Sequence, residues 1–156
     1  MTFQIKDVDL VAYDHRGQPL LLAIVKGGSQ ETSGLWAAQY RRNILEHDTL
    51  PAAPFFLIAT PERMYFWRQR DSGPEEELPQ FTLDATNELG PYFQRVGLTP
   101  KEARGETLEW IVYFWLNDVA EKGQLTAKED PSLGWLSESG LLEALGKAHI
   151  ELSAVQ

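Results

Sequence analysis

Cysteine is absent from this sequence of 156 residues, which excludes disulfide bonds and thiolate metal sites. No apolar run approaches the roughly 20 residues that a membrane-spanning helix requires. The first residues, Met1–Gln4, also lack the basic and apolar segments of a secretory signal peptide. We therefore expect a cytoplasmic protein with no membrane contact.

Motifs of several enzyme classes are missing as well. The three histidines, His15, His47 and His149, share no metal-ligand spacing. No G-x-S-x-G, H-E-x-x-H or glycine-rich phosphate loop occurs, so the signatures of serine hydrolases, zincins and P-loop proteins are excluded. On this basis we expect no cofactor.

Positive charge is scarce and unevenly distributed. The net charge is −9; residues 1–70 hold 8 basic and 7 acidic residues, a net of +1, whereas residues 71–156 hold 6 and 16, a net of −10. Nucleic-acid binding depends largely on pairing Lys and Arg with phosphates, so the second half should repel nucleic acid. We expect weak or no nucleic-acid binding. Two readings remain for the basic residues of the first half: a local basic face, or solvated surface arginines, which we favour.

The sequence does contain enough apolar material for a folded domain. Apolar residues make up 43% and aromatic residues 11% of the chain, as in ordinary globular proteins. The length favours a single domain over residues 1–156. Within it, residues 1–70 should form a hairpin, a helix and two strands. Residues 80–156 should form a mainly helical cover for the sheet face that would otherwise be exposed.

The strongest local pattern runs from Asp9 to Lys26. Two apolar runs, Leu10–Tyr13 and Leu20–Val25, flank a turn at Gly17, which is typical of a β-hairpin. The second run is apolar at almost every position, so it indicates a central strand covered on both faces. Asp9 stands at the entrance of the hairpin and Lys26 at its exit.

After the hairpin we expect a helix capped by Ser33, then two buried strands at 55–59 and 64–68. The helix should pack on the sheet through one apolar stripe, while Arg41 and Arg42 point away. The stripe consists of Trp36, Tyr40 and Ile44, widened by Leu35, Ala38 and Leu45.

The second half predicts three helices and a closing strand. The helices are a short one ended by Gly97, a long one after a capping box at Thr99–Glu102, and one near 140–148 capped by Ser139. The strand is indicated by the alternation of Ile150, Leu152 and Ala154. The long helix should end at Gly123 and bury Leu108, Ile111, Val112, Trp115, Leu116 and Val119. Trp110 lies off this stripe and is the best candidate for an exposed contact.

Over about residues 5–68, this arrangement resembles the core of the PD-(D/E)XK nuclease superfamily. Asp9 matches the family's first metal carboxylate, Lys26 matches its lysine, and Gln39 resembles a polar residue that some members carry on the following helix. Where the family has an acidic residue two positions before the lysine, this chain has Ile24. The resemblance implies an α/β fold with a mixed, mainly antiparallel sheet of four or five strands flanked by helices, similar to the restriction-endonuclease-like core.

Ile24 offers no oxygen to Mg²⁺, the metal that the resemblance implies for an active site. Some superfamily members supply the missing carboxylate from the next helix, and Glu31 and Glu46 are the candidates here. A rescued metal site would use Asp9 with Glu31, which precedes the helix. Without rescue, Asp9 and Lys26 would form a vestigial site, a strand-end ion pair or a solvated pair.

Three functions remain open from the sequence. The favoured one is a catalytically degenerate nuclease-fold protein that acts as a binding or regulatory module, with a protein as one partner to consider. Ile24 and the acidic second half both favour it over an enzyme. The alternatives are a metal-dependent DNA or RNA endonuclease with a relocated carboxylate, and a structural subunit without a ligand.

Overall fold

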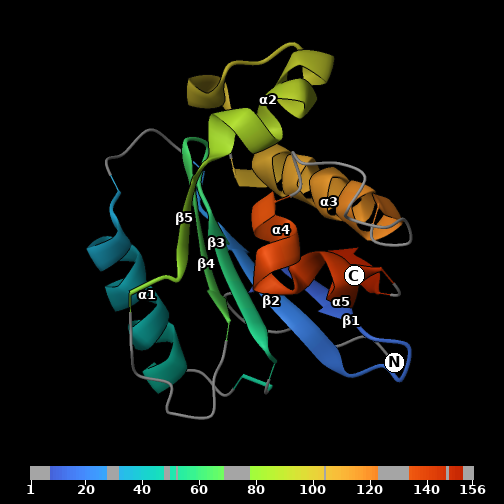
Figure 1. Cartoon of the computed structure of the whole chain (residues 1–156). Helices are drawn as coiled ribbons and strands as arrows, with labels where there is room; N and C mark the ends of the chain where they lie inside the picture. The colour runs from blue at the N-terminus through green and yellow to red at the C-terminus, as the bar shows by residue number, and fades with distance from the viewer. Residues whose placement is uncertain are drawn as a thin grey trace.

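The computed structural model describes residues 8–27, 32–47, 50–51, 53–68, 78–103, 105–122, 134–146 and 148–152. Its strands are β1 (Leu10–Tyr13), β2 (Pro19–Val25), β3 (Phe55–Ala59), β4 (Arg63–Arg68), β5 (Phe81–Asp84) and β6 (His149–Leu152). They form one six-stranded sheet in the order β5-β4-β3-β2-β1-β6 (Figure 1). Strands from both halves of the chain therefore share one sheet.

The expected fold class is confirmed as a mixed, mainly antiparallel sheet flanked by helices. β2 and β3 pair in parallel because α1 (Gly34–His47) crosses over between them, while the other neighbouring strands pair antiparallel. The sheet has six strands rather than four or five. The additional edge strand is β5, whose four residues alternate between half-buried and exposed positions.

The predicted hairpin of β1 and β2 is present, and its turn has a clear local cause. The Oδ1 of Asp14 accepts the backbone N–H groups of Arg16 and Gln18, both at 2.9 Å. Gly17 has a φ of 80°, which a residue with a side chain rarely adopts. The Asp14 side chain and the glycine together reverse the chain and set the register of the two strands.

Two apolar cores lie on opposite faces of the sheet. Residues of β1 to β4 alternate between them, as expected for strands covered on both sides. One core lies under α1. The other lies under α2 (Ala85–Val96), α3 (Gly105–Lys122), α4 (Gly134–Ser139) and α5 (Leu141–Leu145) (Figure 1). The helices of the second half thus cover the face that the first half leaves open.

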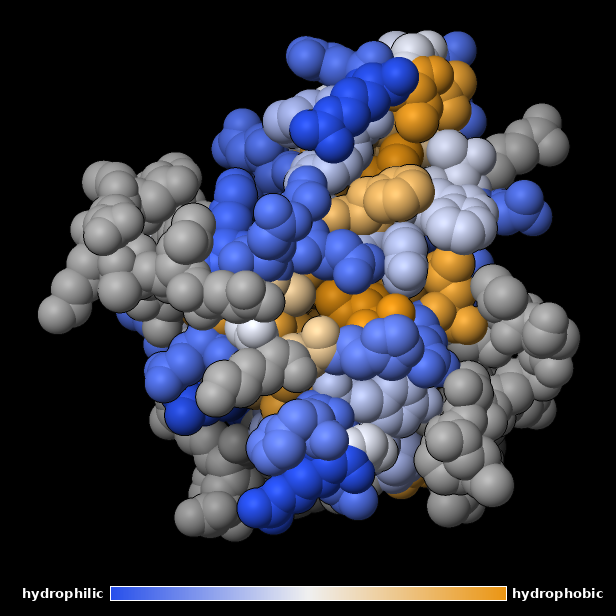
Figure 2. All heavy atoms as spheres, turned by 90° about the vertical axis from the view of Figure 1, so that its right-hand side faces the viewer, coloured by the Kyte–Doolittle hydropathy of each residue, from blue (hydrophilic) through white to orange (hydrophobic). Residues whose placement is uncertain are grey.

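Figure 2 views this helical layer from the right-hand side of Figure 1. Hydrophilic residues dominate this face, and apolar side chains show between them near its centre. No helix among the described residues is long and apolar enough to cross a membrane.

Helix ends agree with most of the predicted capping signals. The Oγ of Ser33 accepts the N–H of Trp36 at 3.1 Å, and Gly97 ends α2 with a φ of 72°. The predicted cap at Ser139 was wrong in position: Ser139 is the last residue of α4 and Gly140 is the N-cap of α5, although the Oγ of Ser139 accepts the N–H of Leu141 at 3.2 Å. The capping box at Thr99 holds a short 3₁₀ turn, η1 (Pro100–Glu102), and α3 begins only at Gly105. Gly123 and Ala154 lie outside the described residues.

The prediction for the buried side of α1 was partly wrong. Leu35 and Leu45 are 62% and 38% exposed, while the guanidinium of Arg41 lies 5.3 Å from the ring centroids of both Phe56 and Trp67. The helix therefore turns Arg41 toward the sheet. An arginine can take this place because its stem is apolar and its planar head stacks on aromatic rings.

Candidate functional site

Asp9 is built into the end of the hairpin just before β1. Its backbone N–H donates to the carbonyl of Ala23 at 2.9 Å, and its Oδ2 accepts the N–H of Val25 at 2.7 Å. The side chain therefore takes the place of a backbone carbonyl at the end of the β1–β2 ladder. This bond fixes the carboxylate in one orientation at a half-buried position.

A second carboxyl group, that of Glu109 on α3, meets Asp9 at this point. Burial, followed by the negative charge of Asp9 and a side-chain hydrogen bond with it, raises the pKa of Glu109 to about 7. The negative charge of Glu106 adds a smaller effect in the same direction. Close to neutral pH, the carboxyl group of Glu109 is therefore protonated for part of the time.

Glu109 is the site residue that the sequence reasoning missed. It follows the buried Leu108 directly and lies at the shoulder of the apolar stripe of α3. An acidic residue beside such a stripe is a weak signal, because most such residues are solvated. Nothing in the sequence indicates that this shoulder faces the start of β1.

Lys26 contacts a different helix, α1. Its backbone N–H donates to the carbonyl of Ala59 at 2.9 Å, and its Nζ lies 5.1 Å from the centroid of the Tyr40 ring on α1. Ammonium and ring therefore form a cation–π contact. The structure thus brings Asp9 together with Glu109 on α3, and Lys26 together with Tyr40 on α1.

Ile24 points into the core beneath α1. Only 1% of its surface is exposed, and its cluster includes the buried side chains of Tyr65 and Trp67. At the position where the resemblance would place a second metal carboxylate, the chain therefore has an apolar core residue. A charged group at this point would have to be buried among aromatic and aliphatic side chains.

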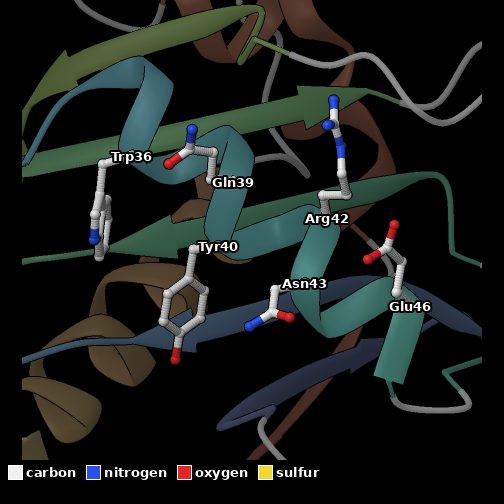
Figure 3. Close-up of a pocket in the computed structure, with 6 residues that line it drawn as sticks. All are labelled: Trp36, Gln39, Tyr40, Arg42, Asn43 and Glu46. Atoms are coloured by element: carbon white, nitrogen blue, oxygen red, sulfur yellow. The ribbon is translucent and has the colours of Figure 1, made fainter.

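Gln39 and Glu46, two further candidates from the sequence, are exposed on the outer side of α1. They line an open pocket of about 430 Å³ together with Trp36, Tyr40, Arg42 and Asn43 (Figure 3). In Figure 3 the rings of Trp36 and Tyr40 project from the same side of α1. Their centroids are 5.5 Å apart. Glu31, the remaining metal candidate, lies outside the described residues.

Polar contacts between the helices have a structural role. The hydroxyl of Tyr92 on α2 donates to the carboxylate of Asp118 on α3, and burial followed by this bond raises the pKa of Tyr92. The Nε1 of Trp135 on α4 donates to Oε1 of Glu88 on α2 at 2.9 Å. These bonds tie α2 to its two neighbours and satisfy groups that the helix packing partly buries.

The site at the start of β1 offers two carboxyl groups of linked protonation. Such a pair can exchange a proton, or can present oxygen ligands to a cation once the proton of Glu109 has left. Among the described residues, no group of three or more His, Asp and Glu side chains is arranged to hold a metal ion. Comparisons of the chain with protein-family models, with curated proteins and with solved structures found no match.

Proposed function

We propose that this chain is a nuclease-like protein that does not cleave nucleic acid and acts instead as a binding or regulatory module. The observation that carries the proposal is the environment of Ile24. Its side chain is buried in the core under α1, at the position that the nuclease resemblance assigns to a second metal carboxylate. A Mg²⁺ ion that assists phosphodiester cleavage needs several oxygen ligands, and an isoleucine supplies none.

The contacts of the other candidate residues support the same proposal. Asp9 uses one oxygen to accept the Val25 N–H and forms a hydrogen bond with Glu109, while Lys26 lies over Tyr40. In a cleaving site of this type, the lysine and the carboxylates would act together on one metal-bound water. Here Asp9 contacts α3 and Lys26 contacts α1, and these two helices cover opposite faces of the sheet.

The test compares Mn²⁺ binding by calorimetry, and cleavage of plasmid and single-stranded DNA, for the wild type and Ile24→Glu. We expect no metal-dependent cleavage by the wild type. The new carboxylate would lie on the same side of β2 as Lys26, so Mn²⁺ should bind more tightly. The melting temperature should fall because a carboxylate is buried, and added Mn²⁺ should restore part of it.

Ile58→Glu is the matched control. Ile58 pairs with Ile24 on the neighbouring strand β3, belongs to the same core and is equally buried. This variant should lose stability without gaining Mn²⁺ affinity. Unchanged metal affinity in a folded Ile24→Glu variant would remove the link between this hairpin and a nuclease site. Cleavage by the wild type that is lost in Asp9→Ala would refute the proposal.

The contact between Asp9 and Glu109 favours a second candidate, a metal-dependent endonuclease with a relocated carboxylate. Glu109 would then supply, from α3, the oxygen ligands that Ile24 lacks. In that case Glu109→Gln should abolish metal-dependent cleavage of DNA or RNA, whereas Glu46→Gln, on the exposed side of α1, should leave it intact. Absence of cleavage by the wild type with Mg²⁺ and with Mn²⁺ would exclude this candidate.

A further inference from the structure

The outward side of α3 carries three aromatic rings that pack on one another. The centroid of Trp110 lies 5.6 Å from that of Tyr113 and 5.8 Å from that of Phe114, and the Tyr113 and Phe114 centroids are 5.6 Å apart. Trp110 is 44% exposed and Phe114 is 51% exposed. Large rings presented together on a surface are typical of sites that contact another molecule.

Two of these rings, Trp110 and Phe114, are not part of the core, whereas Tyr113 packs partly against it. The opposite side of α3 is buried through six residues: Leu108, Ile111, Val112, Trp115, Leu116 and Val119. Trp110 and Phe114 lie on the far side of the helix from this stripe. About half of each residue stays exposed, which leaves that apolar area available to a partner.

Negative charge borders this aromatic group at both ends. Glu106 precedes Trp110 by one helical turn, Glu121 follows Phe114 by two, and both are exposed. At 1.5 Å per residue, the two glutamates stand roughly 22 Å apart along the helix axis. Over its whole length α3 carries four acidic residues and one lysine.

We propose that this face of α3 binds a basic amphipathic helix of another protein. Apolar side chains of that helix would cover the three rings, and Lys or Arg residues at its two ends would pair with Glu106 and Glu121. An Arg of the partner could also stack on Trp110. This is the mode in which an amphipathic helix binds an exposed apolar surface, with complementary charges that set its position.

Charge disfavours the other occupants of this face. In a parallel pair of two copies, Glu106 would face Glu106; in an antiparallel pair, it would face Glu121. Like charges would therefore meet at both ends in either arrangement. Membrane-binding helices carry Lys and Arg on the polar side that faces anionic lipid, and phosphates demand the same, whereas this helix is acidic.

This inference rests on the proposed function, that of a binding module, and deepens it by naming the class of partner. The two are tested separately. Metal binding and DNA cleavage by the wild type and the Ile24→Glu variant test the proposed function. Binding of peptides to α3 tests the inference.

The experiment uses a fluorescently labelled synthetic helix of about 18 residues, which is long enough to span the roughly 22 Å between the two glutamates. It has leucines on one side of its middle part and lysines at both ends. A second peptide has glutamates in place of the lysines. Fluorescence anisotropy with the full chain should show binding of the lysine peptide that is at least about tenfold tighter than binding of the glutamate peptide.

Two double variants assign the binding to the face on α3. Trp110→Ala with Phe114→Ala should weaken binding of the lysine peptide by at least about tenfold. Glu106→Lys with Glu121→Lys should invert the preference and favour the glutamate peptide. Leu35→Ala with Leu45→Ala, which removes exposed apolar residues from α1, is the control and should leave binding unchanged.

Several results would overturn the inference. They are equal binding of the two peptides, no binding of the lysine peptide, and undiminished binding after truncation of Trp110 and Phe114. A wild-type dimer in analytical ultracentrifugation that the same truncation abolishes would assign the face to a second copy. Binding to phosphatidylcholine or phosphatidylserine vesicles that depends on Trp110 would assign it to lipid.

Discussion

Glu109 on α3 forms a hydrogen bond with Asp9 just before β1, and this bond connects the helical layer to the hairpin. The pKa of Glu109 is raised to about 7, above its ordinary value of 4.5. In the unfolded chain the same carboxyl group loses its proton at lower pH. Between these two values the folded state binds more protons than the unfolded state, so stability falls as pH rises.

Glu109→Gln should therefore increase stability at pH 8 and have little effect near pH 5, because glutamine resembles the protonated carboxyl group. Glu109 is partly exposed, and solvent screening reduces the gain to about 1 kcal/mol at pH 8. Urea unfolding at several pH values measures it. Glu121→Gln, at the other end of α3, controls for the change in net charge. Parallel pH curves for wild type and Glu109→Gln would show that the raised pKa of Glu109 does not contribute.

Leu57 should be among the most important core residues, because it lies at the centre of β3 with no exposed surface. Leu57→Ala should cost about 2–5 kcal/mol from lost burial and an unfilled cavity. Leu35→Ala, at a residue that is 62% exposed, should cost less than about 0.5 kcal/mol. The urea midpoints of the Leu57→Ala and Leu35→Ala variants, each compared with the wild type, measure these costs. A cost below about 1 kcal/mol for Leu57→Ala would mean that β3 is not central to the core.

Arg41 should contribute to stability through packing. Its guanidinium lies over Phe56 and Trp67, so Arg41→Ala should cost about 1 kcal/mol, with little dependence on salt. The adjacent Arg42 is exposed, and Arg42→Ala is the control, with no measurable change expected. Melting temperatures of the Arg41→Ala and Arg42→Ala variants at low and high salt provide the measurement. Equal effects of the two substitutions would contradict the contact with the sheet.

Nucleic-acid binding should be weak and should fall steeply with added salt. Residues 71–156 carry a net charge of −10, and one of the arginines of the first half, Arg41, faces the sheet rather than solvent. Few cations therefore remain for phosphates. Anisotropy titrations with labelled duplex and single-stranded DNA at two salt concentrations provide the measurement. Nanomolar binding that does not depend on salt would contradict this expectation.

Periodic patterns predicted the parts of the fold that depend on local sequence. The hairpin, the buried side of α3 and the glycine end of α2 were all correct, because alternation, helical spacing and positive φ act over a few residues. The side of α1 that meets the sheet was partly wrong. Arg41 packs there on two aromatic rings, and a hydropathy pattern does not count an arginine as a core residue.

The candidate site was less predictable, since it depends on how distant elements meet. The sequence identified Asp9 and Lys26 as the ends of the hairpin, but the partners of both come from helices. Glu109 is one hundred positions from Asp9, and only the packing of α3 on the sheet brings the two carboxyl groups together. Three-dimensional contacts of this kind leave no regular spacing in a sequence.

The pairing of β1 with β6 also affects how the chain folds. Tyr13 lies opposite His149 in the sheet, so this edge of the hairpin closes only when two segments at opposite ends of the described chain meet. Contacts between such distant segments slow folding. While β6 is being synthesised, the outer edge of β1 presents free N–H and C=O groups that strands of other chains can join. We expect removal of residues 149–152 to cause aggregation rather than a simple loss of stability.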